Sequence, residues 1–471
     1  MAPGEAPELR RELGLSDLVL TQILFIVGLA WVGVAAKLGP SHVVFWLLAM
    51  TLFYVPSALV VIYLNGLMPL EGGLYQWAKH GFNPFVGFLV AWNLGLFAIL
   101  NVSEIGIQVT QYLGHALSGS GAELMQAKWF IVVSSVVVLG ALVWLSIRGL
   151  SIGKWVHKTG GVLMLVVFVA ILALPLLHLA KGAIAEYHPL ATVTPVVSIM
   201  SLNLLGKMGF GAFGGFEYVA IHAGETRSPS RTIGRSVMIA APVIVLMFIL
   251  GTSSVLALVP GEQIDLIAPI PQVLSLGFAP FGTAAGVATL AILALVVIRL
   301  AQSSVTFAAI TRLPMVAGWD GLLPAWFTKL HPKYQTPANA IIFVGLVTLA
   351  FAMVGMVGVG KQEAFQLLWN AAGIFYALTY LVMFAIPLVG LKGHPRAPLW
   401  LRAAALSGFL MTLLYVLLSV LPIVQVESRL LFGVKISLVI VLANAIGALI
   451  YRRASSRGRE ATEGARTGAA E

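Results

Sequence analysis

The sequence contains no cysteine, so disulfide bonds, thiolate nucleophiles and cysteine metal ligands are excluded. Charged residues make up only 10% of its 471 residues, whereas a soluble globular protein carries about 25%. Enzyme motifs are also missing, because we find no HExxH, no paired aspartate motif and no Ser/His/Asp grouping where apolar segments end. We therefore expect neither an enzyme nor a bound metal or other cofactor.

Apolar residues make up 59% of the chain. A helix needs about 20 mostly apolar residues to cross ~30 Å of hydrocarbon. Twelve apolar segments are bounded by charges, glycine and proline: 16–37, 43–67, 82–115, 129–147, 157–180, 196–223, 234–259, 281–310, 338–357, 364–390, 399–421 and 431–451. They predict an all-α integral membrane protein with about twelve transmembrane helices. We expect a tail at 1–15, one transmembrane domain at 16–451 and a disordered tail at 452–471.

The basic residues predict the orientation of the chain. Of the 28 Lys and Arg residues, twenty fall on the side of the two termini and four on the opposite side. Positive residues beside spans are retained in the cytoplasm. Both termini are therefore expected in the cytoplasm, with the protein in the cytoplasmic membrane. The net charge of +10 is explained by this asymmetry and by contact with anionic lipids, so no nucleic-acid partner is expected.

The sixth segment carries the strongest signal for a site. Five of its ten residues from Gly206 to Gly215 are glycine, and each costs ~0.8–1 kcal/mol in a helix relative to alanine. Unwound backbone at membrane depth is tolerated only where it is buried in protein or lines a cavity, so a break here predicts a binding site. A dinucleotide-binding GxGxxG at residues 209–214 lacks the required preceding strand. A GxxxG packing motif, Gly211 and Gly215, remains an alternative.

Several ionisable and polar side chains also lie within apolar segments. Glu217 directly follows the glycines, and a carboxylate within a span indicates a proton relay, an ion site or a salt bridge, with Lys207 a distant candidate partner. Arg299, Gln302 and Thr306 fall at i, i+3 and i+7 on one helical face. The arginine could bind a carboxylate or neutralise Glu217 or Glu104, or it could lie nearer water. For Glu104, a polar packing seam is the alternative to a functional role.

These segments resemble the amino acid–polyamine–organocation (APC) superfamily of permeases over residues 16–390. Four stretches carry the resemblance: PLEGGLYQW at 69–77 with GFNPFVGF at 81–88, GGFE at 214–217 with GETRSPSR at 224–231, VPGEQI at 259–264, and DGLLP at 320–324. The resemblance implies two inverted five-helix repeats of LeuT type, broken first and sixth helices, two peripheral helices and alternating access.

The resemblance also implies where a substrate binds. The sixth-span cradle would comprise Gly209, Gly211, Ala212, Phe213 and Gly215, and Glu217 would couple protonation to transport. In the first span, relatives carry a Gly-Ser-rich break, whereas this chain offers Thr21, Gln22 and Gly28. Gln302 and Thr306 complete the expected substrate contacts, and Glu104 and Arg299 are assigned to coupling or gating with Glu217.

We interpret the chain as an amino acid permease that works by proton symport or by exchange. Uptake of polyamines or other organic cations is the alternative, for which Glu104 and Glu217 could supply carboxylates, although Arg299 argues against it. An ion channel would explain neither the glycine break nor the charged cytoplasmic loops. The expected partners are a small-molecule substrate and membrane lipids, and a homodimer remains open.

Overall fold

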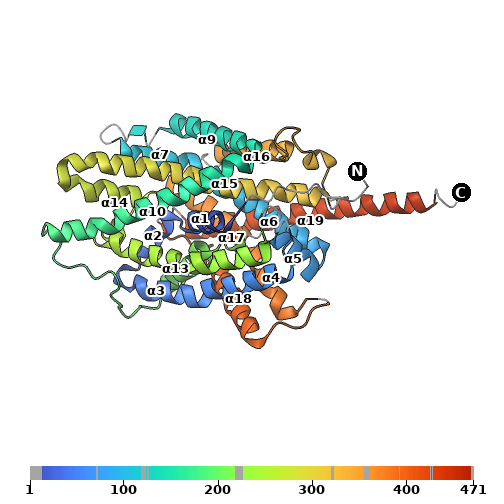
Figure 1. Cartoon of the computed structure of the whole chain (residues 1–471), viewed down its shortest axis with the longest axis horizontal. Coiled ribbons are helices and arrows are strands. Elements are labelled where there is room, and N and C mark those ends of the chain that lie inside the picture. Colours follow the sequence, from blue (N-terminus) through green and yellow to red (C-terminus); the bar gives the residue numbers. More distant parts are fainter. Residues whose placement is uncertain are drawn as a thin grey trace.

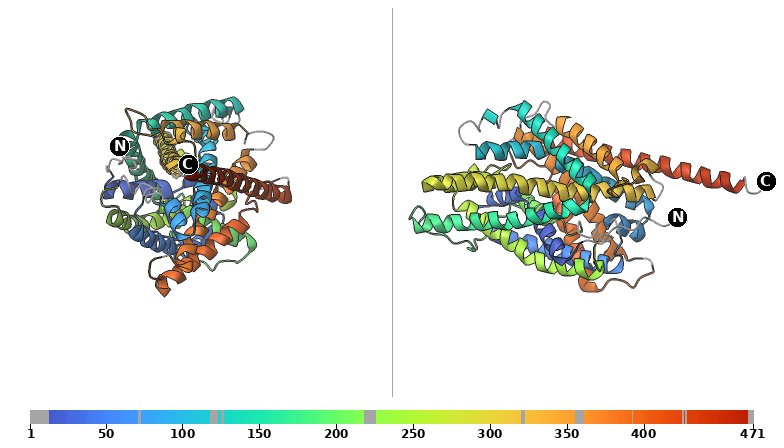
Figure 2. Two further views of the ribbon diagram at one scale, coloured as in Figure 1. Left: turned by 90° about the vertical axis from the view of Figure 1, so that its right-hand side faces the viewer. Right: turned by 45° about the horizontal axis from the view of Figure 1, so that its top comes forward.

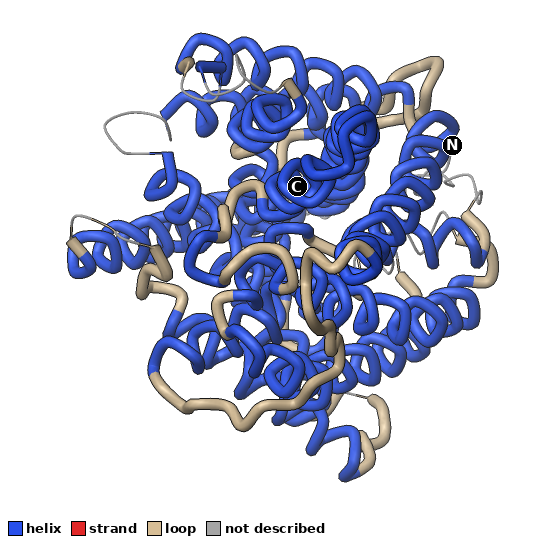
Figure 3. Tube along the Cα trace, turned by 90° about the vertical axis from the view of Figure 1, so that its left-hand side faces the viewer, coloured by secondary structure: helices blue, strands red, loops and turns tan. Residues whose placement is uncertain are grey.

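The structure is a computed structural model of the whole chain (Figure 1). It describes residues 13–70, 73–117, 123–124, 127–217, 226–319, 323–354, 361–391, 393–424, 426 and 428–467. Residues 1–12, 71–72, 218–225 and 320–322 lie outside these ranges. They include most of the predicted N-terminal tail and parts of three of the four resemblance stretches. Figure 3 shows helices and loops throughout the described chain.

The described helices follow the apolar segments in order. The first half contains α1 (Leu15–Ile26), α2 (Leu29–Ala36), η1 (Gly39–Ser41), α3 (His42–Ala49), η2 (Met50–Tyr54), α4 (Val55–Leu67), α5 (Leu74–Gly81), α6 (Pro84–Ser103), α7 (Ile105–Ala116), α9 (Lys128–Arg148) and α10 (Leu150–Ala180). The second half contains α11 (Ile199–Gly206), η3 (Lys207–Ala212), α13 (Pro229–Leu256), η5 (Gly261–Gln263), α14 (Pro269–Phe278), η6 (Ala279–Ala284), α15 (Ala285–Trp319), η7 (Ala325–Thr328), α16 (Ala338–Val354), α17 (Lys361–Val389), α18 (Leu399–Leu418) and α19 (Arg429–Thr467).

Within the described residues, nine helices are long and apolar enough to cross a membrane, or ten when α1 and α2 are counted as one bent span. The sixth and ninth predicted segments correspond to the shorter elements α11–η3 and α16. The prediction of an all-α integral membrane protein is confirmed. Long helices such as α10, α13 and α15 run side by side along the molecule (Figures 1 and 2).

The first span is broken. α1 and α2 meet at an angle of 43°, because Val27 (ψ 81°) and Gly28 (ψ 115°) leave the helical region. A side chain at Gly28 would place its Cβ 2.6 Å from Cδ1 of Trp31, so glycine is needed for this close approach. The break therefore forms from a single glycine rather than from a Gly-Ser-rich stretch.

The sixth span is irregular over a longer stretch. α11 passes into one π-helical turn, η3, and the helix is interrupted at Gly214 and Gly215. Gly215 has φ 138°, a backbone conformation that L side chains rarely adopt. The glycine cluster thus coincides with the predicted break, and the π-turn changes which residues of this span share a face.

The C-terminal tail differs from its prediction. Disorder was expected from Arg452, but α19 continues as a helix to Thr467 and projects from the bundle (Figures 1 and 2). The tail contains alanine, arginine and glutamate and no proline. Since α19 is already formed within the span, extending it requires no new helix nucleation.

Candidate functional site

A cavity of about 100 Å³ lies where the broken spans meet the third, eighth and tenth spans. Its wall includes backbone from the break in the first span and side chains from α6, α7, α15, α17 and α18. The lining residues are Phe25, Ile26, Gly28, Leu29, Ala30, Trp31, Phe97, Asn101, Glu104, Gln108, Tyr112, Phe210, Gly211, Gly214, Arg299, Gln302, Thr306, Trp369, Ala372, Gly373, Tyr376 and Tyr415.

The broken end of α1 is held by the eighth span. The amide nitrogen of Gln302 donates hydrogen bonds to the carbonyl oxygens of Leu24 (2.8 Å) and Val27 (3.0 Å). The last carbonyls of a helix lack partners within the helix, and leaving them unpaired at membrane depth is costly. Gln302 therefore stabilises the first-span break and fixes it against α15.

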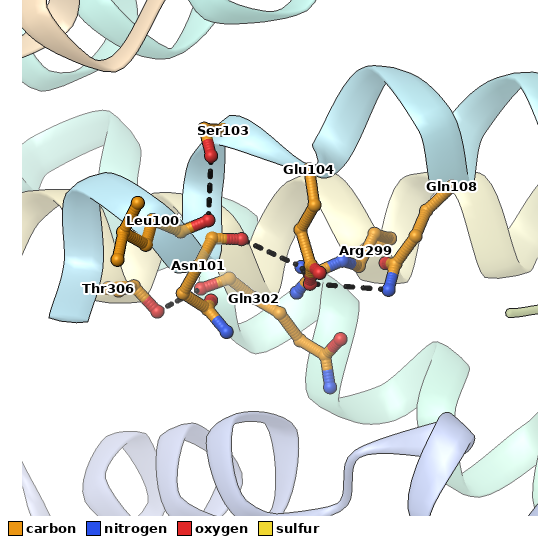
Figure 4. A network of polar contacts seen from close by, with 8 residues as sticks. All are labelled: Leu100, Asn101, Ser103, Glu104, Gln108, Arg299, Gln302 and Thr306. Atoms are coloured by element: carbon orange, nitrogen blue, oxygen red, sulfur yellow. Dashed lines mark hydrogen bonds and ion pairs between the residues drawn. The ribbon is translucent and has the colours of Figure 1, made fainter. Parts of the chain in front are cut away.

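Two polar stripes face one another across part of the cavity wall (Figure 4). Asn101, Glu104 and Gln108 belong to the third span, which is interrupted at Glu104 between α6 and α7. Arg299 on α15 donates to Oε1 of Glu104 (3.1 Å) and to the carbonyl of Asn101 (3.3 Å). The side chains of Glu104 and Arg299 are only 2% and 11% exposed. The arginine thus neutralises Glu104 rather than Glu217.

Much of the remaining wall is aromatic. Trp31 meets Trp369 edge to face, with ring centroids 4.9 Å apart, and Phe97 stacks on Tyr376 at 4.2 Å. A Cβ at Gly211 would lie 2.4 Å from Cη2 of Trp31. The indole therefore occupies space that only glycine at this position of η3 provides.

Glu217 lies behind the cavity and is fully buried. Its two carboxylate oxygens accept hydrogen bonds from the hydroxyls of Tyr376 and Tyr380 on α17. The Tyr380 hydroxyl also accepts a hydrogen bond from the backbone nitrogen of Gly215 (2.8 Å). Tyr376 lines the cavity as well, so it connects the cavity directly to the buried carboxylate.

Lys207 does not pair with Glu217. Its ammonium donates to Oδ1 of Asn370 (2.8 Å) and lies 5.6 Å from the ring centroid of Tyr415. Asn370 is oriented in turn, because its amide nitrogen donates to the carbonyl of Ser419 (2.9 Å). The tenth span therefore holds the sixth span on both sides of its break, through Asn370 on one side and two tyrosines on the other.

One charged cluster lies at the end of the third span. Asp265, in the loop before α14, accepts hydrogen bonds from Gln111 (3.0 Å) and from the backbone of Ile267 (2.9 Å), and lies 3.7 Å from His115. Burial alone would raise the pKa of Asp265, but His115, Ile267 and Gln111 together hold it below its ordinary value. This cluster ties the loop to α7.

The structure brings some of the predicted site residues together and separates others. Those at the cavity are Gly28, Gly211, Gln302, Thr306, Glu104 and Arg299. Gln22 instead donates to Ser236 of α13 (2.6 Å). Phe213 packs against Trp46, Tyr54 and Phe248, and a Cβ at Gly209 would meet Met411. Thr21, Ala212, Gly215 and Glu217 are also not among the lining residues.

Sequence reasoning did not single out the aromatic lining residues Phe25, Trp31, Phe97, Tyr112, Phe210, Trp369 and Tyr415. Aromatic side chains are frequent throughout the apolar segments, so their type carried no signal of a cavity. A usable signal was the spacing of Asn101, Glu104 and Gln108, which repeats the i, i+3, i+7 pattern of the eighth span. Among the described residues, no group of three or more His, Asp or Glu side chains could hold a metal ion.

Comparisons with known proteins agree with this architecture. The family pattern described as "Amino acid permease" matches residues 13–446. An uncharacterised transporter of Legionella pneumophila is 21% identical over 83% of this chain and 83% of its own. The branched-chain amino acid permease BcaP of Bacillus subtilis is 25% identical over 76% of this chain and 80% of its own. The probable agmatine/putrescine antiporter AguD of Lactococcus lactis is 20% identical over 94% and 93%, respectively.

Proposed function

The chain belongs to the amino acid permease family, and from that premise we propose that it carries amino acids across the cytoplasmic membrane by alternating access, through proton symport or exchange. The family and the apolar helices make it a multi-pass membrane transporter rather than an enzyme. The substrate and the driving force are the proposed part.

One observation carries the proposal: the cavity lies at the two broken spans and is lined by Gly28 of the first and Gly211 of the sixth. Leu29 and Ala30, the first residues of α2, also line it. The N-terminus of a helix favours negative charge, and broken membrane helices use this to bind a substrate carboxylate. The substrate's carboxylate is accordingly placed against the start of α2.

Proton coupling is assigned to Glu217. A fully buried carboxylate at membrane depth is an expensive feature that marks an ion or proton site by default. Tyr376 gives it a route to the substrate, because this side chain both lines the cavity and donates to Glu217. A substrate that moves the Tyr376 ring changes the hydrogen bonding of the carboxylate.

Polyamine uptake is the second candidate. It is favoured by the similarity to a probable agmatine/putrescine antiporter over 94% of this chain. Against it stands the ion pair of Glu104 with Arg299, because the carboxylate at the cavity is already neutralised.

The proposed topology has both termini in the cytoplasm, because basic residues are in excess on the side of the termini.

Transport in proteoliposomes tests the proposal. The purified full-length protein is reconstituted, and uptake of labelled amino acids and putrescine is measured with and without an inward proton gradient. Saturable amino acid uptake is expected. Accumulation driven by the gradient indicates symport, and uptake only into amino-acid-loaded vesicles indicates exchange. Uptake of putrescine alone, or flux that does not saturate, would contradict the proposal.

A further inference from the structure

The wall formed by the third and eighth spans differs chemically from the rest of the cavity. Asn101, Glu104 and Gln108 face Arg299, Gln302 and Thr306 (Figure 4). The rest of the lining consists mostly of aromatic, small and aliphatic residues. Because the break backbone of the first and sixth spans is assigned to the substrate's charged main-chain groups, a substrate's side chain meets this polar wall. The chemistry of the wall therefore sets which side chains are accepted.

The charges on this wall cancel. Oε1 of Glu104 accepts from Arg299 (3.1 Å) and from Gln108 (3.4 Å), and the arginine makes a second bond to the carbonyl of Asn101 (3.3 Å). A cationic side chain beside Glu104 is repelled by Arg299, and an anionic one beside Arg299 is repelled by Glu104. The wall thus disfavours both signs of charge.

The wall nevertheless retains hydrogen-bonding capacity. Asn101, Gln302 and Thr306 present amide and hydroxyl groups along the cavity. A ligand side chain that donates or accepts hydrogen bonds can pair with these groups, whereas an aliphatic side chain cannot.

The size of the cavity limits the ligand further. Its volume is only about 100 Å³, so a bulky side chain would require the walls to move. Trp31 and Trp369, which pack edge to face, form part of its wall. Short side chains are therefore favoured.

We propose that the Glu104–Arg299 wall selects amino acids with small, uncharged, hydrogen-bonding side chains, with threonine, serine and asparagine as the preferred substrates. This inference rests on the proposed function and names the substrate class of the same site. The neutral pair excludes charged side chains by repulsion, and the polar wall around it disfavours aliphatic side chains, because they cannot form hydrogen bonds with it.

Isosteric amino acids separate polarity and charge from size. In proteoliposomes containing the full-length parent protein, kcat/KM is measured for threonine against valine and for asparagine against aspartate. We expect threonine to exceed valine by at least about tenfold, a lower bound because a site built for hydrogen bonds can reject an analogue that lacks them by about 10⁴–10⁵. We expect asparagine to exceed aspartate as well, because the wall disfavours charge. Equal values for threonine and valine, or faster lysine or putrescine uptake, would overturn the inference.

Variants that change the charge of Glu104 or Arg299 test the same pair through substrates that are gained. Arg299→Gln leaves Glu104 unneutralised and is expected to gain lysine and putrescine uptake, whereas Glu104→Gln is expected to gain aspartate uptake. The double variant is uncharged and should lose both gains while keeping the preference for threonine. Single variants that keep the parent's selectivity while transporting threonine would overturn the assignment.

The two proposals fail in different ways. A parent that transports valine or lysine best remains an amino acid permease but overturns the selectivity assigned here. A parent that transports none of the amino acids tested overturns the proposed function and this inference with it.

Discussion

Replacing Gln302 by methionine tests whether the eighth span holds the break in the first span. Methionine keeps the length of the side chain and fills its volume, but it removes the amide that donates to Leu24 and Val27 at 2.8 and 3.0 Å. Both carbonyls lie at the end of α1, where no intrahelical donor is available. The substitution therefore leaves two acceptors unpaired within the bundle.

The expected loss of stability follows from the number of hydrogen bonds that the substitution removes. An interhelical hydrogen bond in a membrane protein contributes about 0.6 kcal/mol on average and about 1.7 kcal/mol at most. Removing two should lower the free energy of unfolding by about 1–3 kcal/mol. Uptake should fall as well, because Gly28, Leu29 and Ala30 line the cavity directly after the carbonyls that Gln302 holds.

The assay compares reversible unfolding in mixed micelles, and uptake in proteoliposomes, for Gln302→Met and a matched control. Thr311→Val is the control, because Thr311 lies on the same helix but is not among the residues lining the cavity, and its hydroxyl donates within α15 to the carbonyl of Ala308 (3.1 Å). The control should lose less than about 0.5 kcal/mol. A Gln302→Met protein as stable and as active as the control would refute the role assigned to this amide.

Three further predictions concern other parts of the molecule. Gly211→Leu should insert normally into the membrane but abolish uptake, because even a Cβ at this position would lie 2.4 Å from Trp31. Gly95→Leu is the control and should transport normally, because a Cβ there meets nothing within 4 Å. Equal uptake by both variants would argue against a cavity at Gly211. Glu217→Gln should flatten the pH dependence of uptake, since an amide cannot carry the proton, and Tyr376→Phe should shift it by removing one hydrogen bond to the carboxylate; pH profiles identical to the parent's would remove the coupling role. Asp265→Asn should destabilise the protein by roughly 1–2 kcal/mol at pH 7 through weaker hydrogen bonds. Because the pKa of Asp265 is lowered on folding, that stability is present above the unfolded pKa of about 3.9 and is lost as pH falls through the lower folded pKa; a stability difference that does not shrink in acid would contradict the assignment.

The spans were predictable from the sequence because hydrocarbon thickness and backbone hydrogen bonding leave few choices. The sixth-span irregularity was predictable for a related reason, since five glycines between Gly206 and Gly215 weaken a helix wherever it lies. The stripe of Arg299, Gln302 and Thr306 could also be placed on one face from its spacing alone, and all three line the cavity. In that part of the chain, regular helical periodicity was sufficient to predict which side chains share one face of the helix.

The rest depends on three-dimensional information that periodicity does not contain. A π-helical turn covers Lys207–Ala212 in the sixth span, and within it Gly211 lines the cavity whereas Gly209 packs toward Met411. The packing of other spans determines which partner each buried charged side chain has. Lys207, for example, bonds to Asn370 rather than to Glu217. The aromatic walls depend on helix rotation, which the composition of an apolar segment does not reveal.

The absence of cysteine allows a direct test of where the substrate binds. Thr306→Cys introduces a single thiol into the cavity wall, and Ala191→Cys places one in an exposed loop. In membranes treated with a small polar thiol reagent, we expect saturating substrate to slow labelling at position 306, with half-protection near the transport KM, and to leave labelling at position 191 unchanged. Labelling at position 306 at the same rate with and without saturating substrate would show that the cavity between the broken spans does not hold the transported molecule.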